Sequence, residues 1–189
     1  MTNESVRVAA FAGSLRKGSF NKALVRAATE LAPRTMTIEV VDLGEVPLYD
    51  ADVEAEGDPE PVRALKRAIG EADGLLIATP EYNHGLPAVT KNAVDWASRP
   101  PRDSVLNGLP VAVMGATPGG WGTARAQSIL RQSFVFTDSP CMRKPEMLVA
   151  RAREKFDDDG RLTDEKTRKY LKGFLESFGD FVRREGRGR

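Results

Sequence analysis

The sequence predicts an α/β domain in which helices cover both faces of a five-stranded parallel sheet. Short apolar stretches alternate about five times with stretches whose apolar residues have helical spacing, and this alternation is typical of parallel sheets with right-handed crossovers. One of the strands, at 74–79, is apolar throughout, which is expected of a central strand covered on both faces. A chain of 189 residues favours one domain over two, so the domain is expected to span 1–189.

The first third of the chain predicts two strands, one helix and a loop. Residues 6–12 form an apolar run rich in small and β-branched residues, which favours a buried strand. A helix is expected at 21–31 from its apolar spacing, with Asn21 as its N-cap. The partly alternating stretch 36–43 predicts the second strand, and the acidic, proline-containing stretch 47–61 predicts a loop.

The middle of the chain continues the alternation on both sides of the strand at 74–79. Apolar residues at helical spacing predict helices at 62–72, 86–97 and 123–136. The run at 110–116 predicts a fourth strand, since it is short, apolar and closed by a loop containing three glycines.

The last third predicts a short fifth strand and a final helix. The strand is expected near 146–149, and an amphipathic helix is expected at 163–184. The basic tail at 183–189 is interpreted as a solvated end rather than as a nucleic-acid site.

Composition excludes several classes of function. The formal charge of +1 gives no overall field that would attract nucleic acid or an acidic membrane. Cys141 and His84 are the only cysteine and the only histidine, so no disulfide and no cysteine or histidine metal centre is expected. No signal peptide and no membrane-spanning run is recognised, and the expected compartment is the cytoplasm.

Three loops rich in Gly, Pro, Ser, Thr or Asn follow three of the expected strands. They lie at 13–21, 80–85 and 116–122. In open α/β sheets, ligands bind at the carboxyl ends of the strands, near the point where the strand order reverses. The three loops are therefore expected to meet at one ligand site.

The loop at 13–21 has the groups that bind phosphate. Its hydrogen-bond donors are the side chains of Ser14, Arg16, Ser19 and Asn21, together with backbone N–H groups that lead into a helix N-terminus. Two familiar phosphate motifs do not fit. The P-loop requires Lys-Ser/Thr where Ser19-Phe20 stands, and Leu15 takes the place of the second glycine of the dinucleotide fingerprint. The loop therefore favours a terminal monophosphate.

Three motifs in the same order resemble the NADPH-dependent FMN reductase family, and within it the branch that reduces quinones, chromate and azo dyes. They are Gly-Ser-Leu-Arg-Lys-Gly-Ser-Phe-Asn at 13–21, Pro-Glu-Tyr-Asn at 80–83 and Lys-Asn-Ala-Val-Asp-Trp at 91–96, and the likeness extends through 117–125 and 144–146. The resemblance implies a flavodoxin-like fold and covers most of the chain.

The resemblance also implies a set of cofactor-binding residues. Ser14, Arg16, Ser19 and Asn21 would hold the FMN phosphate, with Phe20 alongside. Pro80, Glu81, Tyr82 and Asn83 would edge the isoalloxazine ring, largely through backbone groups, and Thr117, Pro118 and Gly119 would flank its other side. No side chain is expected to act as a catalytic group and no metal is expected, because the flavin performs the chemistry.

The implied activity is ping-pong hydride transfer, in which NAD(P)H reduces the bound FMN and leaves before a quinone, chromate or an azo compound takes its place. The family also implies a homodimer or homotetramer with the helix at 86–96 in an interface. The chain departs from the family pattern at Ala88, Thr90 and Thr123, and at His84, where an aromatic or small polar residue is frequent. These departures leave substrate preference and the details of assembly open.

Two other functions fit the same fold. A flavodoxin-type electron carrier without NAD(P)H turnover is the main alternative, although such carriers tend to be strongly acidic and this chain is nearly neutral. A phosphotransfer receiver or hydrolase is disfavoured because Thr79, not aspartate, ends the third strand.

Single residues outside the motifs have structural interpretations as well as functional ones. Cys141 is expected to be a small buried residue, and His84 a surface residue that could also donate protons. Trp96 and Trp121 are expected to serve in packing or interfaces, with Trp121 the better platform for a substrate. Arg125 and Glu146 could pair between subunits or lie on a solvated surface.

Overall fold

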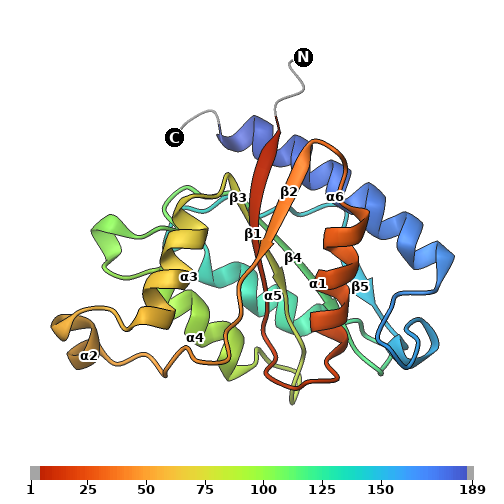
Figure 1. Ribbon diagram of the computed structural model, residues 1–189, viewed down its shortest axis with the longest axis horizontal. Helices are drawn as coiled ribbons and strands as arrows, with labels where there is room; N and C mark the ends of the chain where they lie inside the picture. Colours follow the sequence, from red (N-terminus) through yellow and green to blue (C-terminus); the bar gives the residue numbers. More distant parts are fainter. Residues whose placement is uncertain (1–4, 187–189) are drawn as a thin grey trace.

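The computed structural model describes residues 5–186 and contains a five-stranded parallel sheet (Figure 1). The strand order is β2-β1-β3-β4-β5, the flavodoxin-like order in which the reversal lies between β1 and β3. The strands are β1 (Val6–Ala12), β2 (Met36–Val40), β3 (Gly74–Ala78), β4 (Val111–Ala116) and β5 (Met147–Val149). The predicted fold class is thus confirmed.

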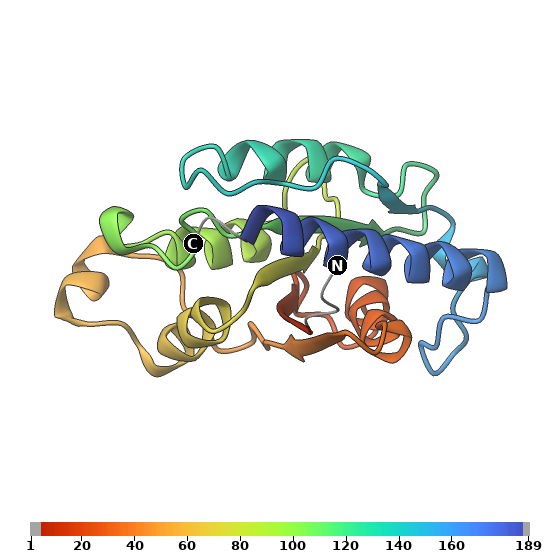
Figure 2. The same cartoon turned by 90° about the horizontal axis from the view of Figure 1, so that it is seen from above.

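The helices divide between the two faces of the sheet, and each face has its own apolar core. They are α1 (Phe20–Leu31), α2 (Ala51–Glu56), α3 (Glu60–Gly70), α4 (Ala88–Ala97), α5 (Ala124–Ser133) and α6 (Glu165–Glu185). Helices α1 and α6 pack on one core, and α3, α4 and α5 pack on the other. Helix α6 crosses the sheet near the amino ends of its strands, as Figure 2 shows from above.

Successive strand side chains point to opposite faces, which explains why the middle strands are apolar throughout. All residues of β3 and β4 are buried, and alternate residues such as Leu75 and Leu76 join different cores. A strand with helices on both faces has no solvent-facing side.

Several predicted boundaries are wrong. The N-cap of α1 is Ser19 rather than Asn21, because the Ser19 hydroxyl accepts hydrogen bonds from the backbone at the helix start. Strand β2 ends at Val40, and the stretch predicted as a loop at 47–61 contains α2 and the start of α3. The first part of the predicted basic tail, 183–185, belongs to α6, which continues to Glu185. Its last part, 187–189, lies outside the described residues.

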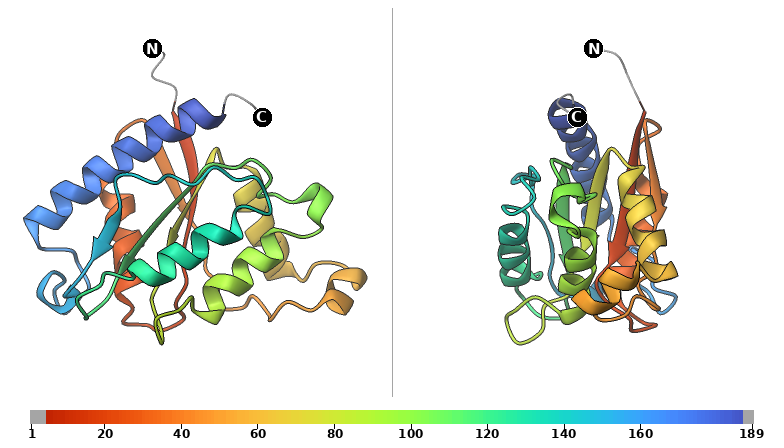
Figure 3. Two further views of the ribbon diagram at one scale, coloured as in Figure 1. Left: turned by 180° about the vertical axis from the view of Figure 1, so that it is seen from behind. Right: turned by 90° about the vertical axis from the view of Figure 1, so that its left-hand side faces the viewer.

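The segment around α2 projects from the rest of the domain beside α3 and α4 (Figures 1 and 3). Its base is fastened to α4: the Trp96 indole N–H and the Asn92 amide both donate to the Pro47 carbonyl oxygen, at 2.9 and 2.8 Å. Trp96 is completely buried, with its ring edge-on to Tyr49. This confirms the packing interpretation of Trp96.

Within residues 5–186, no helix has both the length and the apolar composition needed to cross a membrane.

Candidate active site

The loops that follow β1, β3 and β4 leave the sheet at the same edge, the lower edge in Figure 1. Backbone hydrogen bonds hold the start of each loop to the neighbouring strand. Gly13 N donates to Ala78 O at 2.9 Å, Thr79 N to Met114 O at 2.9 Å, and Thr117 N to Val149 O at 3.0 Å. The structure therefore brings together the three segments that the sequence singled out.

The loop between β1 and α1 ends in a helix N-terminus that has no carboxylate of its own. The Ser19 hydroxyl accepts the backbone N–H groups of Asn21 and Lys22, at 3.2 and 3.4 Å. The first turn of α1 contains no acidic residue. Helix N-termini carry a partial positive charge that favours anions, so a bound anion would complete this end of the helix.

Two donors of the same loop have no partner within residues 5–186. The Ser14 side chain makes no hydrogen bond there although the residue is buried, with an exposed fraction of 5%. Arg16 is exposed and makes neither a hydrogen bond nor an ion pair within the same residues. Its guanidinium lies close to Gly18: a Cβ atom added to that glycine would be 3.6 Å from Arg16 Nη2. Both groups are available to phosphate oxygens.

The other two residues predicted at the phosphate have partners within the protein. The Asn21 side chain forms two hydrogen bonds with Ala116, donating to its carbonyl oxygen at 3.0 Å and accepting its N–H at 2.9 Å. Asn21 thereby fastens the start of α1 to the end of β4. The half-buried Phe20 packs against Phe156, with ring centroids 5.6 Å apart.

Glu81 lies at the N-terminus of α5. Its Oε2 accepts the backbone N–H groups of Arg125 and Ala126, at 3.0 and 3.2 Å, and its side chain is only 9% exposed. Burial by itself raises the pKa of Glu81. The two backbone N–H groups, His84 and the charge of Arg125 together lower this pKa by more than burial raises it, so the pKa lies below its ordinary value of 4.5. The carboxylate therefore caps α5 and joins the loop after β3 to that helix.

A tight two-residue turn follows Glu81. Tyr82 and Gly85 pair through hydrogen bonds in both directions, and the two residues between them, Asn83 and His84, have φ angles of 51° and 61°. Positive φ at both central positions is typical of a type I′ turn, in which Asn is favoured. The backbone N–H groups of Asn83 and His84 have no acceptor within the described chain, so they are free to bind a ligand. Pro80, before this turn, is buried.

The loop after β4 is fixed at its base and open at its tip. The carbonyl oxygens of Thr117 and Gly119 accept the N–H groups of Ala152 and Arg151, at 3.0 and 2.9 Å. Pro118 and Gly119 are exposed, and Thr117 is half-buried. The exposed part of this loop can therefore donate backbone hydrogen bonds to a ligand while the hydrogen bonds to Arg151 and Ala152 stay in place.

Two glycines allow helices to approach the strand ends closely. A Cβ on Gly13 would lie 1.8 Å from Thr90 Oγ1, and a Cβ on Gly115 would lie 1.9 Å from Thr123 Oγ1. Thr90 and Thr123 are fully buried. These two departures from the family pattern thus fill space between the strand ends and α4 or α5. Sequence patterns alone gave no signal for this packing.

Aromatic and cationic side chains lie on the loops after β3 and β4 and at the start of α5. Tyr82 is 57% exposed and Trp121 is 65% exposed, and the Arg125 guanidinium lies 4.7 Å from the centre of a Trp121 ring. The sequence identified Trp121 as a platform candidate but did not predict its contact with Arg125. Glu146 lies elsewhere, beside Lys144.

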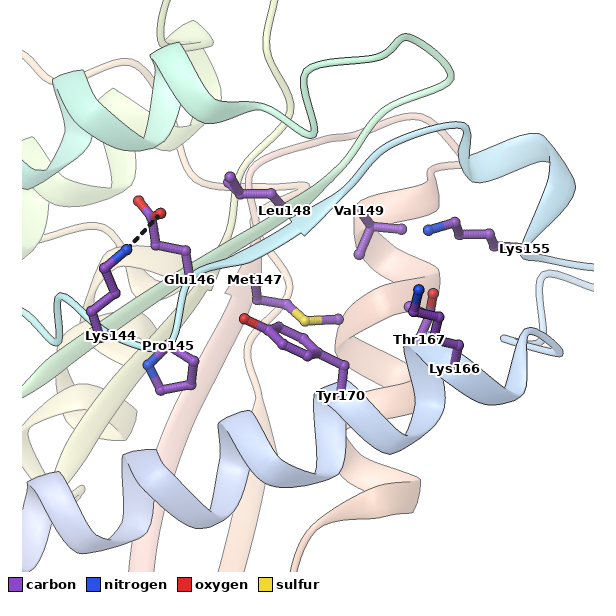
Figure 4. Close-up of a pocket in the computed structure, with 10 residues that line it drawn as sticks. All are labelled: Lys144, Pro145, Glu146, Met147, Leu148, Val149, Lys155, Lys166, Thr167 and Tyr170. Carbon is purple, nitrogen blue, oxygen red and sulfur yellow. Dashed lines mark hydrogen bonds and ion pairs between the residues drawn. The ribbon is translucent and has the colours of Figure 1, made fainter.

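Cavities also occur away from the three loops. One of about 690 Å³ lies between β5 and α6, where Lys144, Lys155 and Lys166 surround Met147 and Tyr170 (Figure 4). None of the predicted cofactor-binding residues lines it. By contrast, a smaller cavity of about 210 Å³ is lined by Leu15 of the loop at 13–21 and by residues of α4.

Cys141 is partly buried rather than fully buried. Arg131 donates a hydrogen bond to its sulfur atom. Burial raises the pKa of the Cys141 thiol, although Arg131 opposes this shift. The thiol is therefore not activated as a nucleophile.

Comparison with known proteins identifies relatives along nearly the whole chain. The profile of the NADPH-dependent FMN reductase family matches residues 6–154. An NAD(P)H-dependent FMN reductase of Pseudomonas aeruginosa is 44% identical over 182 residues, covering 96% of this chain and 98% of the relative. A 2-hydroxy-1,4-benzoquinone reductase of a Burkholderia species is 45% identical over 179 residues, covering 95% and 97%.

A solved structure shows the same likeness in three dimensions. The flavoenzyme NAD(P)H:(acceptor) oxidoreductase FerB of Paracoccus denitrificans superposes with a TM-score of 0.87 at 38% identity. The match covers 95% of this chain and 98% of the FerB chain.

Proposed function

Because the chain belongs to the NADPH-dependent FMN reductase family, we propose that it is an FMN-dependent oxidoreductase that oxidises NAD(P)H and reduces quinones or similar small acceptors. Relatives at 43–45% identity are named quinone reductases and NAD(P)H-dependent FMN reductases, and the predicted cofactor and reaction type are those of these relatives. Chromate and azo compounds remain proposed acceptors, as expected from the sequence motifs.

The observation that carries this proposal is the loop at 13–21. Within residues 5–186 it combines an arginine without a partner, a serine hydroxyl without a partner and a helix N-terminus without an acidic residue. These are the groups that a terminal phosphate requires. They fit the phosphate of FMN, and we propose that Ser14, Arg16 and the start of α1 at Ser19 hold it.

The other loops are proposed to position the ring system of the cofactor. Asn83 and His84 can donate backbone N–H groups to it, and the open tip at 117–119 lies on the neighbouring strand end. Bound FMN supplies the hydride chemistry. The chain orients it, places backbone donors where negative charge develops and leaves an opening beside Tyr82 and Trp121 for NAD(P)H and then the acceptor.

The proposed function is tested with purified protein reconstituted with FMN. We expect a yellow complex whose absorbance near 450 nm is lost when NADPH is added without oxygen and returns when a quinone is added. A protein that binds no FMN would overturn the proposal. Tight FMN binding without loss of colour on addition of NADPH or NADH would instead support the electron-carrier function, which the near-neutral charge and the names of the relatives do not favour.

We further propose that the protein acts in the cytoplasm as a homodimer or homotetramer. The exposed face of α4, the helix predicted at an interface, carries Ala88, Lys91 and Asp95, and the last two form an ion pair. This face is more polar than a typical homodimer core, and the proposed interface would therefore depend on charge matching around it. Sedimentation equilibrium measures the assembly state, and a monomer at micromolar concentration would contradict this part of the proposal.

A further inference from the structure

Two buried threonine hydroxyls meet between the end of β3 and α4. Thr79 directly follows β3, Thr90 lies in the first turn of α4, and both residues are fully buried. We propose that Thr79 and Thr90 are a positioning pair, which holds the peptide group between Pro80 and Glu81 so that the Glu81 N–H points at the ring of the bound cofactor. This inference rests on the proposed function, because it names residues that act on the cofactor of that function.

The direction of the hydrogen bonds in the pair follows from the protons available. The Thr79 hydroxyl donates to the Pro80 carbonyl oxygen at 2.9 Å, and its oxygen lies 3.2 Å from that of Thr90. A hydroxyl has one proton to donate, so the Thr79 oxygen must accept the proton of Thr90. Neither hydroxyl has another hydrogen-bond partner within residues 5–186. The two bonds therefore form a chain from Thr90 through Thr79 to Pro80.

This chain sets the orientation of one peptide group. The ring of Pro80 fixes its φ angle, so rotation about ψ is the main freedom left to the peptide group that follows. The hydrogen bond from Thr79 holds the Pro80 carbonyl oxygen on the buried side. In a trans peptide the N–H points away from the carbonyl oxygen, and the bond between Pro80 and Glu81 is not one of the cis bonds of the described chain. The Glu81 N–H is thus directed away from the threonine pair.

The Glu81 N–H has no acceptor in the part of the chain that the structure describes. The groups around it are all held: the Glu81 carboxylate accepts two N–H groups of α5, and Tyr82 pairs with Gly85. A backbone donor is rarely left without a partner in a native protein, so this N–H is available to a ligand. Its segment is one of those proposed to position the ring system of FMN, and the ring is therefore its proposed acceptor.

Thr90 favours one of two orientations of this peptide group. If the group turned over, the Glu81 N–H would face Thr79, whose oxygen can accept such a bond. Because the Thr90 hydroxyl donates to Thr79, one acceptor position of Thr79 is taken, and the Thr79 proton finds its acceptor in the Pro80 carbonyl. Thr90 is one of the departures from the family pattern, so this second bond of the pair is a feature of this chain.

Substitutions of nearly equal volume test the pair. Thr79→Val and Thr90→Val exchange the hydroxyl for a methyl group, whereas Thr79→Ser and Thr90→Ser keep the hydroxyl and lose the methyl group. Thr137→Val is the matched control. Thr137 is also buried and also pairs with a hydroxyl, that of Ser139 at 2.6 Å, next to the segment that precedes β4.

The first readout is the two-electron midpoint potential of bound FMN, measured against a reference dye. A backbone N–H aimed at the ring binds the more negative, reduced form of FMN more strongly than the oxidised form. We expect Thr79→Val to weaken binding of reduced FMN about 10-fold relative to oxidised FMN, which lowers the potential by about 30 mV for two electrons. Thr90→Val should lower the potential by less, and both serine variants should keep the potential of the original protein.

The second readout does not depend on turnover. Amide hydrogen exchange, followed by ¹⁵N NMR, reports on the Glu81 N–H in the protein with and without FMN. FMN should slow its exchange about 10-fold or more in the original protein and in Thr137→Val, and this protection should fall in Thr79→Val. Thr79→Val should also weaken FMN and riboflavin equally, because the contact is with the ring and not with the phosphate.

Two results would overturn the inference. One is a lower free energy of unfolding in Thr79→Val and Thr90→Val without a change in potential or in Glu81 exchange, which would mean that the pair only fastens α4 to β3. The other is an equal shift in potential in Thr137→Val. Should Thr79→Val not fold, Thr90→Val, which leaves the bond to Pro80 in place, decides by the same readouts.

The failure of this inference is distinct from the failure of the proposed function. If the original protein binds FMN and NADPH reduces it, either overturning result removes the positioning pair alone and the proposed function stands. An original protein that binds no FMN overturns both.

Discussion

At the scale of single residues, Arg16 shows how an unpaired charge can indicate a ligand. It has no carboxylate partner within residues 5–186, and it lies over Gly18 near the start of α1. Exposed arginines without partners are common, but the hydroxyl of Ser14 in the same loop also lacks a partner within residues 5–186. The coincidence of free donors in one loop, more than the arginine alone, supports a phosphate site.

Replacing Arg16 tests this site directly. Arg16→Ala should weaken FMN binding by a factor corresponding to about 1.5–3 kcal/mol, the usual contribution of a hydrogen bond to a charged group. Riboflavin, which lacks the phosphate, should bind nearly as before. Quenching of flavin fluorescence on titration measures both affinities, and Arg34→Ala serves as an exposed control. Equal losses for FMN and riboflavin would show that Arg16 does not face the phosphate.

Glu81 has a structural role in addition to the one that the family resemblance implies. The resemblance places it beside the flavin, and the structure shows its carboxylate at the N-terminus of α5. The two roles are compatible, because the family resemblance implies that this segment contacts the flavin mainly through its backbone groups. The carboxylate keeps that backbone in place.

Replacing Glu81 by glutamine should lower the free energy of unfolding by about 1 kcal/mol at neutral pH, a typical helix-cap contribution. The pKa of Glu81 is lowered in the folded state, so its contribution is complete above its unfolded pKa and is lost as the pH falls through the folded pKa. Urea unfolding of both proteins from pH 7 to pH 3 measures the difference. A difference that does not shrink toward acid pH would show that the charge of Glu81 is unimportant.

At the scale of elements, α1 shows why a helix start is difficult to place from sequence. Ser19 and Asn21 are both good N-cap residues, and they stand two positions apart. The structure uses Ser19 as the cap, because Asn21 is committed to Ala116 on β4. The hydrogen bonds between Asn21 and the distant residue Ala116 therefore explain why Ser19, and not Asn21, is the N-cap.

The N-cap assignment can be tested by mutation. Ser19→Ala should lower the free energy of unfolding by about 1 kcal/mol, since two N–H groups lose their acceptor, and Ser19→Thr should cost less. It should also weaken FMN binding, because the cap and the proposed phosphate site share the same helix end. Thermal unfolding without FMN and titration with FMN separate the two effects, and unchanged stability in Ser19→Ala would contradict the assignment.

At the scale of the whole molecule, Asn21 joins parts of the domain that are 95 positions apart. It is buried, and its two hydrogen bonds to Ala116 join the loop at 13–21 to the strand that leads into the loop at 117–119. The Asn21 amide therefore joins two of the three loops that are proposed to form the site.

Asn21→Ala should destabilise the fold more than the cap mutation does. Ala116 would be left with an unpaired N–H and an unpaired carbonyl group at a buried position, at a cost of about 1–3 kcal/mol for each buried group. We expect a loss of at least about 2 kcal/mol in urea unfolding together with weaker FMN binding. A loss of FMN binding at full stability would instead indicate that Asn21 contacts the cofactor directly.

The sequence by itself determined the order of the strands, their parallel arrangement, most of the helices and the three loops that are proposed to form the site. These properties follow from local patterns: apolar runs, helical spacing and turn residues. Because every strand of a parallel sheet points the same way, the loops after β1, β3 and β4 had to meet at one edge. The clustering of phosphate donors at 13–21 could therefore be interpreted without coordinates.

The tertiary structure alone decided which of these residues remain free for a ligand. The loop at 13–21 indicated Asn21 as a phosphate donor, and the family resemblance implied Glu81 beside the flavin. In the folded chain, Ala116 and the N-terminus of α5 bind these two side chains from 95 and 44 positions away. Buried polar groups must find partners, and which partner is nearest depends on how the chain packs. Contacts over such separations leave no pattern in a short stretch of sequence, so only the folded chain could assign them.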